Sequence, residues 1–380
     1  FIMLKIINKW RHKYNSQING YFLILPSFIL ISLFGIFPIF YSLFISLHKW
    51  RVRKVEFRGF ANYEKLLGDP LYALIFFIGL CLILLSYWFW KDSFKKITNR
   101  ILIKISSIII LLFAFYLIDV GWNQIMQTGD DRYLNSLIHS AYYSFFVVSI
   151  EIILGLLIAY ALFQKIKGKQ FFQMFIFMPY ITPAVMASTV FLIIFSNRET
   201  SFANNIIHFF GGSPQQFLAD TRTLSEILFG LKLEGLWAGP SVAMMTVIFF
   251  GVWNHTGYYA VILLAGLGGI PKNLYEAAAI DGAGTVYMFR KITIPLLSPI
   301  IFFLAVSGFI LSFQAFNHIY VLRTPLAGET LDVVSISIFD SFYGRNKFGY
   351  ASAQAICLFC LIILLTISQF LFFRRKIHYE

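Results

Sequence analysis

The stretch LYEAAAIDGAGTVYMFRKITIPLLSPI, residues 274–300, interrupts the apolar character of the chain between segments 241–267 and 296–320. It combines three consecutive alanines with four charged side chains and two glycines, whereas neither flanking segment contains Asp, Glu, Lys or Arg. A bilayer core needs about 20 apolar residues per helix, and both flanks exceed that length. The stretch therefore predicts a polar connection between two membrane-spanning helices.

A short helix is predicted inside this connection. Pro271 lies where a helix can begin, because the missing N–H of proline costs nothing in the first turn. Residues 272–280 have strong helix formers at their centre, and the pair Asp281-Gly282 ends the helix. Pro295 is then expected to start the next span. We therefore expect a helix outside the membrane that is tethered at both ends to spanning helices.

The composition of the whole chain agrees with a membrane protein. The 380 residues are 58% hydrophobic and 13% charged, with a mean hydropathy of +0.74. Soluble domains are usually about 45–50% apolar and about 25% charged. The fold class is therefore predicted as all-α, a polytopic membrane protein with about eight transmembrane helices. The candidate spans are 21–47, 71–90, 101–121, 138–163, 171–196, 241–267, 296–320 and 350–373.

The predicted organisation follows from these spans. The first span follows four basic residues and is too long for a signal peptide, so we interpret it as uncleaved. The predicted divisions are an N-terminal tail at 1–20, three spans at 21–121, a core at 122–373 with the loop 268–295, and a C-terminal tail at 374–380.

The distribution of basic residues predicts the orientation. The two tails and the loops 91–104, 164–170 and 268–295 hold 18 of the 31 Lys and Arg residues and carry a net charge of +14. The opposite loops are neutral overall. Cytoplasmic loops are enriched in Lys and Arg, so both termini and the loop 268–295 are assigned to the cytoplasm. The net charge of +13 is explained by this topology, and no nucleic-acid partner is expected.

One segment does not follow this rule. HKWRVRKVEFRG, residues 48–59, is basic although it falls on the outer side. The outer loops 197–240 and 321–349 are the longest segments between spans, and they contain the polar, Gly and Pro residues of a surface that meets a soluble partner.

The short helix itself favours docking to another protein. Its three alanines leave a smooth face, and Glu276 projects from it. The alternative is an amphipathic helix resting on lipid, but that class has a basic polar face. Docking therefore fits better.

The stretch resembles the EAA motif of the permeases of binding-protein-dependent ABC importers. The motif reads E-A-A, two residues, D-G-A and then I-x-(I/L)-P, and here it ends in Ile294-Pro295. Further segments, such as FRGFANYEKLLGDP (57–70) and MPYITPAVMASTVFLIIF (178–195), are similar to the sugar-transporting branch. Two features depart from the usual pattern: the extra spans at 71–121, which the maltose-type permease shares, and VLRTPLAGE (321–329) in place of L-T-x-G-G-P.

The resemblance implies a type I permease core whose cytoplasmic coupling helix inserts into a groove of an ATPase dimer. The expected coupling residues are Tyr275, Glu276, Ala277, Ala278, Ile280, Asp281, Gly282 and Ala283. No G-x-x-x-x-G-K-[ST] loop occurs, so this chain is expected to have no catalytic residues, and ATP and Mg are expected on the partner ATPase. The resemblance also implies a second, different permease subunit, a solute-binding protein and a bacterial cytoplasmic membrane.

Polar residues within two spans suggest a solute pathway, since such residues are costly in a bilayer. Rings that cover C–H faces and amides that bond hydroxyls suit a neutral sugar. For each single residue, a hydrogen bond between helices is an equally good explanation. His318 is expected to be a packing residue, and Glu151 to bond a neighbouring helix. The candidate pathway residues are Trp253, Asn254, His255, Tyr258, Gln314, Phe316 and Asn317.

Three other functions stay open. The same scaffold could carry another solute such as glycerol phosphate, although no Lys or Arg lies within spans six and seven. An integral-membrane lipid enzyme would need clustered acid, base or nucleophile residues, and a secondary transporter would show inverted repeats. Neither pattern is found.

Cys357 and Cys360 form a C-x-x-C within an apolar run, where packing explains them better than a metal site.

Overall fold

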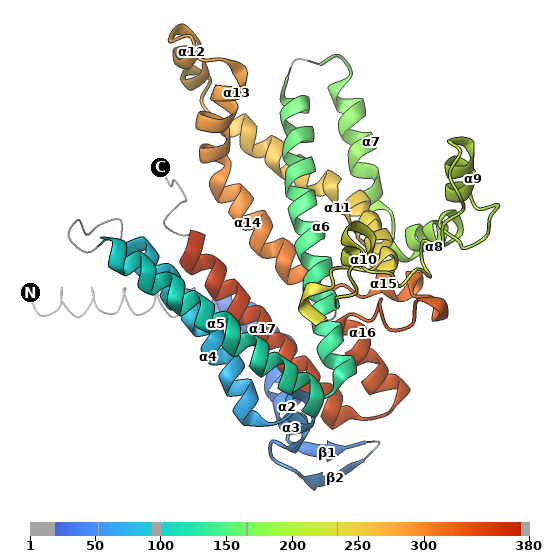
Figure 1. Cartoon of the computed structure of the whole chain (residues 1–380). Helices are drawn as coiled ribbons and strands as arrows, with labels where there is room; N and C mark the ends of the chain where they lie inside the picture. Colours follow the sequence, from blue (N-terminus) through green and yellow to red (C-terminus); the bar gives the residue numbers. More distant parts are fainter. Residues whose placement is uncertain (1–19, 52, 93–99, 165, 234, 374–380) are drawn as a thin grey trace, which may run out of the picture. The chain divides into compact units, whose positions relative to one another are not determined.

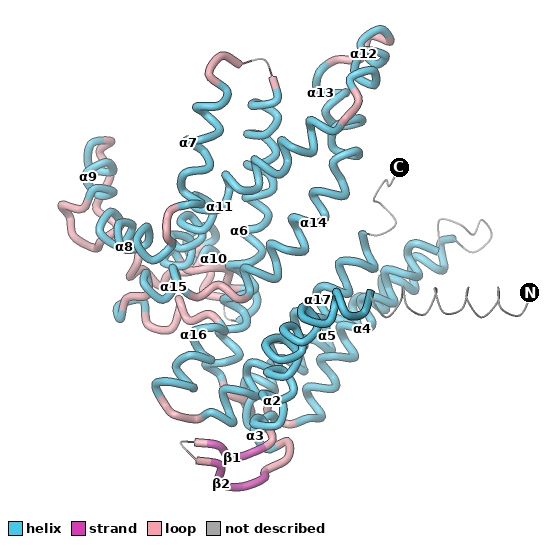
Figure 2. The backbone as a smooth tube through the Cα atoms, turned by 180° about the vertical axis from the view of Figure 1, so that it is seen from behind, coloured by secondary structure: helices cyan, strands magenta, loops and turns pink. Residues whose placement is uncertain are grey.

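The computed structural model describes residues 20–51, 53–92, 100–164, 166–233 and 235–373 and is almost entirely helical (Figures 1 and 2). The predicted tails at 1–20 and 374–380 therefore lie outside the described residues except for Gly20. The contacts divide the chain into a smaller unit, Phe1–Tyr63 with Ser341–Cys357, and a larger unit, Glu64–Asp340 with Leu358–Glu380. The predicted division at residue 121 stays a prediction.

The smaller unit contains the first span and a β-hairpin. The helix Gly20–Ser46 includes a π-helical turn η1 (Ser32–Ile36) and α2 (Phe37–Ser46). Strands β1 (His48–Trp50) and β2 (Lys54–Phe57) pair antiparallel, with His48 opposite Phe57. Helix α3 (Ala61–Leu67) begins in this unit, and η5 (Asp340–Gly344) leads into α17 (Phe348–Phe373).

The larger unit holds the other spans and their connections. Its elements are α4 (Pro70–Asp92), α5 (Arg100–Thr128), α6 (Asp131–Phe163), α7 (Lys169–Ile181), α8 (Ala184–Ile194), α9 (Phe202–Phe209), α10 (Leu224–Phe229), η2 (Gly235–Trp237), α11 (Val242–Gly269), α12 (Lys272–Ile280), α13 (Thr285–Met288), η3 (Phe289–Thr293), α14 (Ile294–Phe313), α15 (Asn317–Leu322), η4 (Pro325–Ala327) and α16 (Val334–Phe339).

The prediction of about eight spans is confirmed. Among the described residues, seven helices are long and apolar enough to cross a membrane, and a bent pair of helices brings the count to eight. That pair is α7 and α8, so the predicted span at 171–196 consists of two helices with a sharp bend between them. The two helices meet at 92° around Thr182-Pro183. Proline has no N–H to donate and disfavours a helical backbone in the residue before it, so the helix ends there.

Two further boundaries differ from the prediction. The span expected to start at Pro295 begins ten residues earlier, because α13 continues through the π-helical turn η3 into α14. Pro295 has no N–H to donate to the preceding turn. The π-turn shifts the backbone hydrogen bonds there, so the helix continues without that donor. The expected span 296–320 ends at Phe313, and α15 starts after a break at 314–316. The Ser335 hydroxyl donates to the Ala315 carbonyl, so a tertiary contact replaces helical pairing at this break.

Helices α4 and α5 form a closely packed hairpin. The Ser86 hydroxyl donates to the Ser107 carbonyl at 2.8 Å, and the Ser107 hydroxyl donates back to the Ser86 carbonyl at 2.7 Å. A Cβ on Gly121 would lie 2.8 Å from the backbone nitrogen of Phe76, which is too close for any side chain. Small residues and hydroxyls are the usual means of joining helices in lipid.

This packing predicts that Gly121→Leu separates α4 from α5. We expect a loss of about 1–3 kcal/mol of stability from overpacking. The measurement is the thermal unfolding midpoint of the purified chain in nanodiscs. Gly35→Leu is the matched control, because a Cβ there meets only the Ile31 Cγ2 at 3.9 Å. Equal midpoints for the two variants would contradict the close packing at Gly121.

Candidate functional site

The connection between α11 and α14 folds as expected, and a glycine closes its helix. Helix α12 runs from Lys272 to Ile280. The N–H of Gly282 donates to the Ala279 carbonyl at 3.0 Å, and the N–H of Ala283 donates to the Ala278 carbonyl at 2.9 Å. These two bonds form a Schellman cap, which requires a left-handed residue at Gly282. Its φ of 80° meets that requirement at no steric cost.

Tyr275 fixes this helix to the rest of the larger unit. Its hydroxyl lies 2.9 Å from the Thr293 Oγ1, and Thr293 is fully buried at the base of α14. The Tyr275 ring packs against a core cluster that includes Leu267 and Leu297. The structure therefore directs Tyr275 toward its own helices, although the sequence grouped it with the residues of a docking face.

The other predicted coupling residues leave a free face on α12 and its cap. Ala278 and Ala283 are half-buried. The Ile280 side chain is 87% exposed, which is costly for a large apolar group unless another molecule covers it. The remaining predicted residues Glu276, Ala277, Asp281 and Gly282 are exposed.

Helix α12 lies at one end of the helices of the larger unit. Figures 1 and 2 show α12 and α13 at the same end as the connection between α6 and α7. The rings of Tyr160 and Phe289 are 4.7 Å apart, which confirms that these segments are neighbours. The predicted loops 164–170 and 268–295 therefore share one side of the protein.

The pathway candidates on α11 fall into an aromatic group. The Tyr258 ring stacks on the Tyr180 ring of α7 at 4.8 Å, and the His255 ring lies 5.9 Å from Tyr180. The side chain of His255 is 39% exposed, and its Nδ1 lies 3.2 Å from the Gly251 carbonyl oxygen. If Nδ1 carries the proton, Nε2 is left as a hydrogen-bond acceptor. This arrangement offers ring faces and one polar atom to a bound molecule.

Asn254 has a different contact. It is 4% exposed, and its amide donates to the Pro179 carbonyl at 2.7 Å. In a continuous helix that carbonyl would accept from residue 183, which is a proline without an N–H. The Thr182 N–H donates to this carbonyl at 3.2 Å, and Asn254 adds a second, shorter hydrogen bond from α11, so it is a poor candidate for direct solute contact.

The remaining pathway candidates surround the break between α14 and α15. Gln314 and Asn317 are exposed, while Phe316 is half-buried and stacks on Tyr320 at 5.1 Å. Trp253 contacts Phe191 of α8 at 4.9 Å between ring centroids. Phe191 belongs to a core cluster formed by α6, α8, α11 and α15, and Phe316 packs against that cluster. These candidates therefore lie on helices that share a core.

The prediction for His318 is confirmed, and Glu151 is buried near α11. His318 is 6% exposed, lies 2.7 Å from the Tyr143 hydroxyl and stacks on Phe250, so it is a satisfied packing residue. Glu151 is 3% exposed, and the Tyr259 hydroxyl of α11 donates to the Leu304 carbonyl, so the predicted bond of Glu151 to a neighbouring helix stays a prediction. Its Oε1 also lies 3.8 Å from the Nδ1 of His255, a neighbour that the sequence separation concealed.

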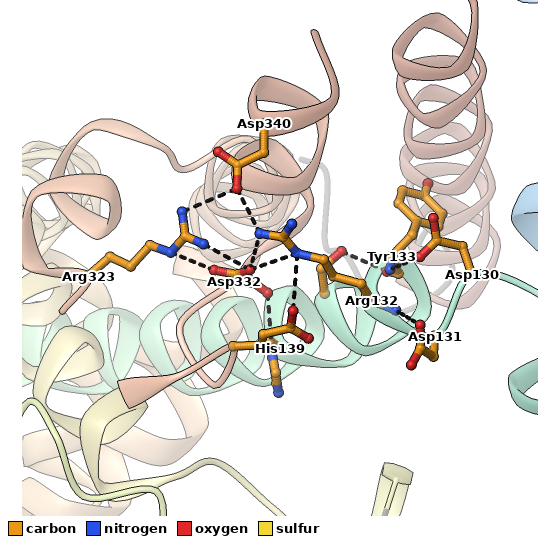
Figure 3. Close-up of polar contacts among 10 residues, drawn as sticks. Asp130, Asp131, Arg132, Tyr133, His139, Arg323, Asp332 and Asp340 are labelled. Atoms are coloured by element: carbon orange, nitrogen blue, oxygen red, sulfur yellow. Dashed lines mark hydrogen bonds and ion pairs between the residues drawn. The ribbon is translucent and has the colours of Figure 1, made fainter. Parts of the chain in front are cut away.

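A charged network at the opposite end of α6 was not predicted (Figure 3). The Asp332 side chain is 2% exposed and lies 2.8 Å from the Arg132 Nη2 and 2.7 Å from the Arg323 Nε. Asp340 pairs with the same two arginines, at 2.7 and 3.3 Å. The network joins the start of α6 to the segment 323–340. Of its members, Arg323 lies within 321–329, the stretch that departs from the family pattern.

No group of three or more His, Cys, Asp or Glu that could hold a metal ion occurs within the described part of the chain. Within the described residues, no disulfide joins the cysteines at 81, 357 and 360.

The network predicts a large effect of Asp332→Asn. Removing one partner of a buried ion pair leaves uncompensated charge, so we expect a loss of about 3 kcal/mol of stability. The thermal unfolding midpoint in nanodiscs measures it. Glu226→Gln serves as the control, because its pair with Lys232 is 3.8 Å long and the lysine is 85% exposed. An Asp332→Asn variant as stable as the wild type would show that the network does not hold this segment.

Comparison with known proteins identifies the family. The model of the binding-protein-dependent transport system inner membrane component matches residues 151–378. The trehalose/maltose transport system permease protein MalF of Thermococcus litoralis is 25% identical over 357 residues, which cover 93% of each chain. The sn-glycerol-3-phosphate transport system permease protein UgpA of Agrobacterium fabrum is 29% identical over 254 residues, covering 66% of this chain and 79% of that relative.

A solved structure shows the same fold. The bacterial alginate ABC transporter in complex with an alginate pentasaccharide-bound periplasmic protein contains a chain that is 20% identical, with a TM-score of 0.54. The match covers 75% of this chain and 97% of that chain. The family model and the fold together lead to one conclusion: the chain belongs to the inner membrane components of binding-protein-dependent transport systems, the permeases of ABC importers.

Proposed function

We propose that this permease carries a sugar or oligosaccharide into the cytoplasm, driven by ATP hydrolysis on a separate ATPase dimer that docks on α12. The observation that carries the docking is the exposed face of α12 with its Ile280 side chain 87% exposed. A second, different permease subunit completes the pathway, and an external solute-binding protein delivers the solute. Both termini are assigned to the cytoplasmic side.

The neutral solute is supported by two observations. The match to the trehalose/maltose permease extends over 93% of this chain, whereas the match to the glycerol-3-phosphate permease covers 66%. In addition, α11 and α14 contain no Lys or Arg, the residues that would bind a phosphate. The stacked rings of Tyr180 and Tyr258 offer the flat surface that a sugar ring requires.

The mechanism follows from how α12 is attached. Closure of the ATPase dimer around ATP would displace α12 at the membrane surface. The contact between Tyr275 and Thr293 connects that displacement to the base of α14, whose other end leads to the break at Gln314. Movement of α14 against α6 and α11 would then open the pathway alternately to each side. ATP and Mg are bound by the partner, and this chain supplies the movement of the helices.

Purification of the intact transporter from its native membrane tests the proposal. We expect an ATPase to co-purify, and its hydrolysis to rise with solute-loaded binding protein. Maltose, trehalose and glycerol 3-phosphate are compared as solutes, and stimulation by glycerol 3-phosphate alone would exclude the sugar assignment. Glu276→Ala with Gly282→Asp is expected to lower the stimulated rate about tenfold or more, because it removes the charge and the cap. Asn273→Ala, exposed on the same helix, is the matched control.

The attachment of α12 predicts a different result for Tyr275→Phe. The ATPase should still co-purify, because the docking face is intact, but solute stimulation should fall about fivefold through loss of one buried hydrogen bond. Thr293→Val should have the same effect, and the double variant should be no worse than either single one. Thr293→Ser keeps the oxygen and should behave as wild type. Loss of ATPase binding in Tyr275→Phe would instead place Tyr275 on the docking face.

A further inference from the structure

The smaller unit carries a concentration of positive charge at one end. Its described residues include seven Lys and Arg residues and one acidic residue, Glu56. Most of these cations lie on or beside the hairpin of β1 and β2, which follows directly after α2. We define the basic surface as Lys49, Arg51, Arg53, Lys54, Arg58 and Arg345, of which all but the half-buried Lys49 are exposed.

The hairpin is held firmly at the end of the first span. The Asn62 amide donates to the carbonyls of Ser46 and His48, at 2.6 and 3.1 Å. The hydroxyls of Ser46 and Tyr63 are 2.6 Å apart. These hydrogen bonds fix the hairpin to the end of the helix. The depth of the hairpin in the membrane is therefore set by the position of Ser46.

The start of α17 lies against the same hairpin. Gly349 approaches the His48 carbonyl so closely that a Cβ there would overlap it. Arg345 precedes the span Phe348–Leu371 by three residues, and Lys49 follows the span Gly20–Ser46 by three residues. Two spans therefore end at this surface, and its cations lie within one short turn or strand of both ends.

The length of the first span sets the depth of these cations. A helix of 27 residues is about 40 Å long, whereas the hydrocarbon core is about 30 Å thick. The end at Ser46 therefore reaches the headgroup layer. Beside the cations, Phe57 and Phe60 are 67% and 70% exposed, and phenylalanine is among the residues with which surface-bound segments enter the boundary between headgroups and acyl chains.

We propose that the basic surface binds the anionic headgroups of phospholipids in the leaflet at this end of the spans. Guanidinium and ammonium groups pair with phosphate oxygens, and the exposed phenylalanines enter the boundary of the acyl chains. This explains why residues 48–59 are basic although the usual distribution of Lys and Arg places few cations on that side. Their cations pair with lipid phosphates where the first span ends. The position of the exposed phenylalanines directly at the ends of two spans favours lipid over the alternative occupant, an acidic soluble protein.

Lipid titration of the purified chain tests this proposal, with native mass spectrometry as the readout. Wild type should bind phosphatidylglycerol more tightly than phosphatidylcholine. Each basic residue near an anionic surface contributes about fivefold, so Arg51→Gln with Arg53→Gln should weaken phosphatidylglycerol binding roughly 25-fold. High salt should reduce the preference of the wild type.

Two comparisons keep the outcome decisive. Arg198→Gln with Lys232→Gln removes the same charge from exposed residues of the larger unit and should retain the preference. Arg51→Lys with Arg53→Lys preserves the charge and should also retain it, which guards against a folding defect in the neutral variant. Equal phosphatidylglycerol binding by wild type and the Arg51/Arg53 neutral variant would overturn the proposal. The proposal would also be overturned if the Arg51/Arg53 neutral variant lost docking of the solute-binding protein but kept its preference for phosphatidylglycerol. That result would favour a protein partner.

Discussion

Backbone carbonyls inside a bilayer need donors from the protein itself, because no water is available to them. The breaks in the spans of this permease are arranged around that need. Pro183 cannot donate to the Pro179 carbonyl, which accepts instead from the Thr182 N–H at 3.2 Å and from the Asn254 amide of α11 at 2.7 Å. The Ala315 carbonyl in the break after α14 accepts from Ser335. Each break is therefore hydrogen-bonded to a second helix: the end of α7 to α11, and the break after α14 to α16.

The short helix α12 is attached to the long helices at two points. Helix α12 is closed at one end by the Schellman cap at Gly282 and fixed in its middle by Tyr275 on Thr293. Thr293 belongs to the π-turn that lies just before Pro295. A force on the exposed face of α12 is thus delivered to the irregular base of α14. At the far end of the unit, the network of Arg132, Asp332 and Asp340 fixes the segment 323–340 to α6.

The sequence was sufficient for features that depend on local pattern. The spans follow from apolar length, and the bounds of α12 follow from Pro271 and Asp281-Gly282. The resemblance to a permease family rests on the same short stretch. Features made by distant contacts were out of reach. Arg132 and Asp332 are 200 residues apart, and neither position carries a local signal of pairing. Asn254 looked like a solute ligand because its partner, a carbonyl released by a proline at 183, is visible only in three dimensions.

The central claim is that the exposed face of α12 is the docking site of the ATPase, and site-specific photo-crosslinking tests it most directly. A benzophenone amino acid is placed at Ile280 in the intact transporter, and a second variant carries it at Phe209, which is 83% exposed on α9. We predict a crosslink to the ATPase from position 280 and none from position 209. A crosslink from position 209 alone, or none from position 280 in a transporter that still hydrolyses ATP on solute addition, would contradict the account.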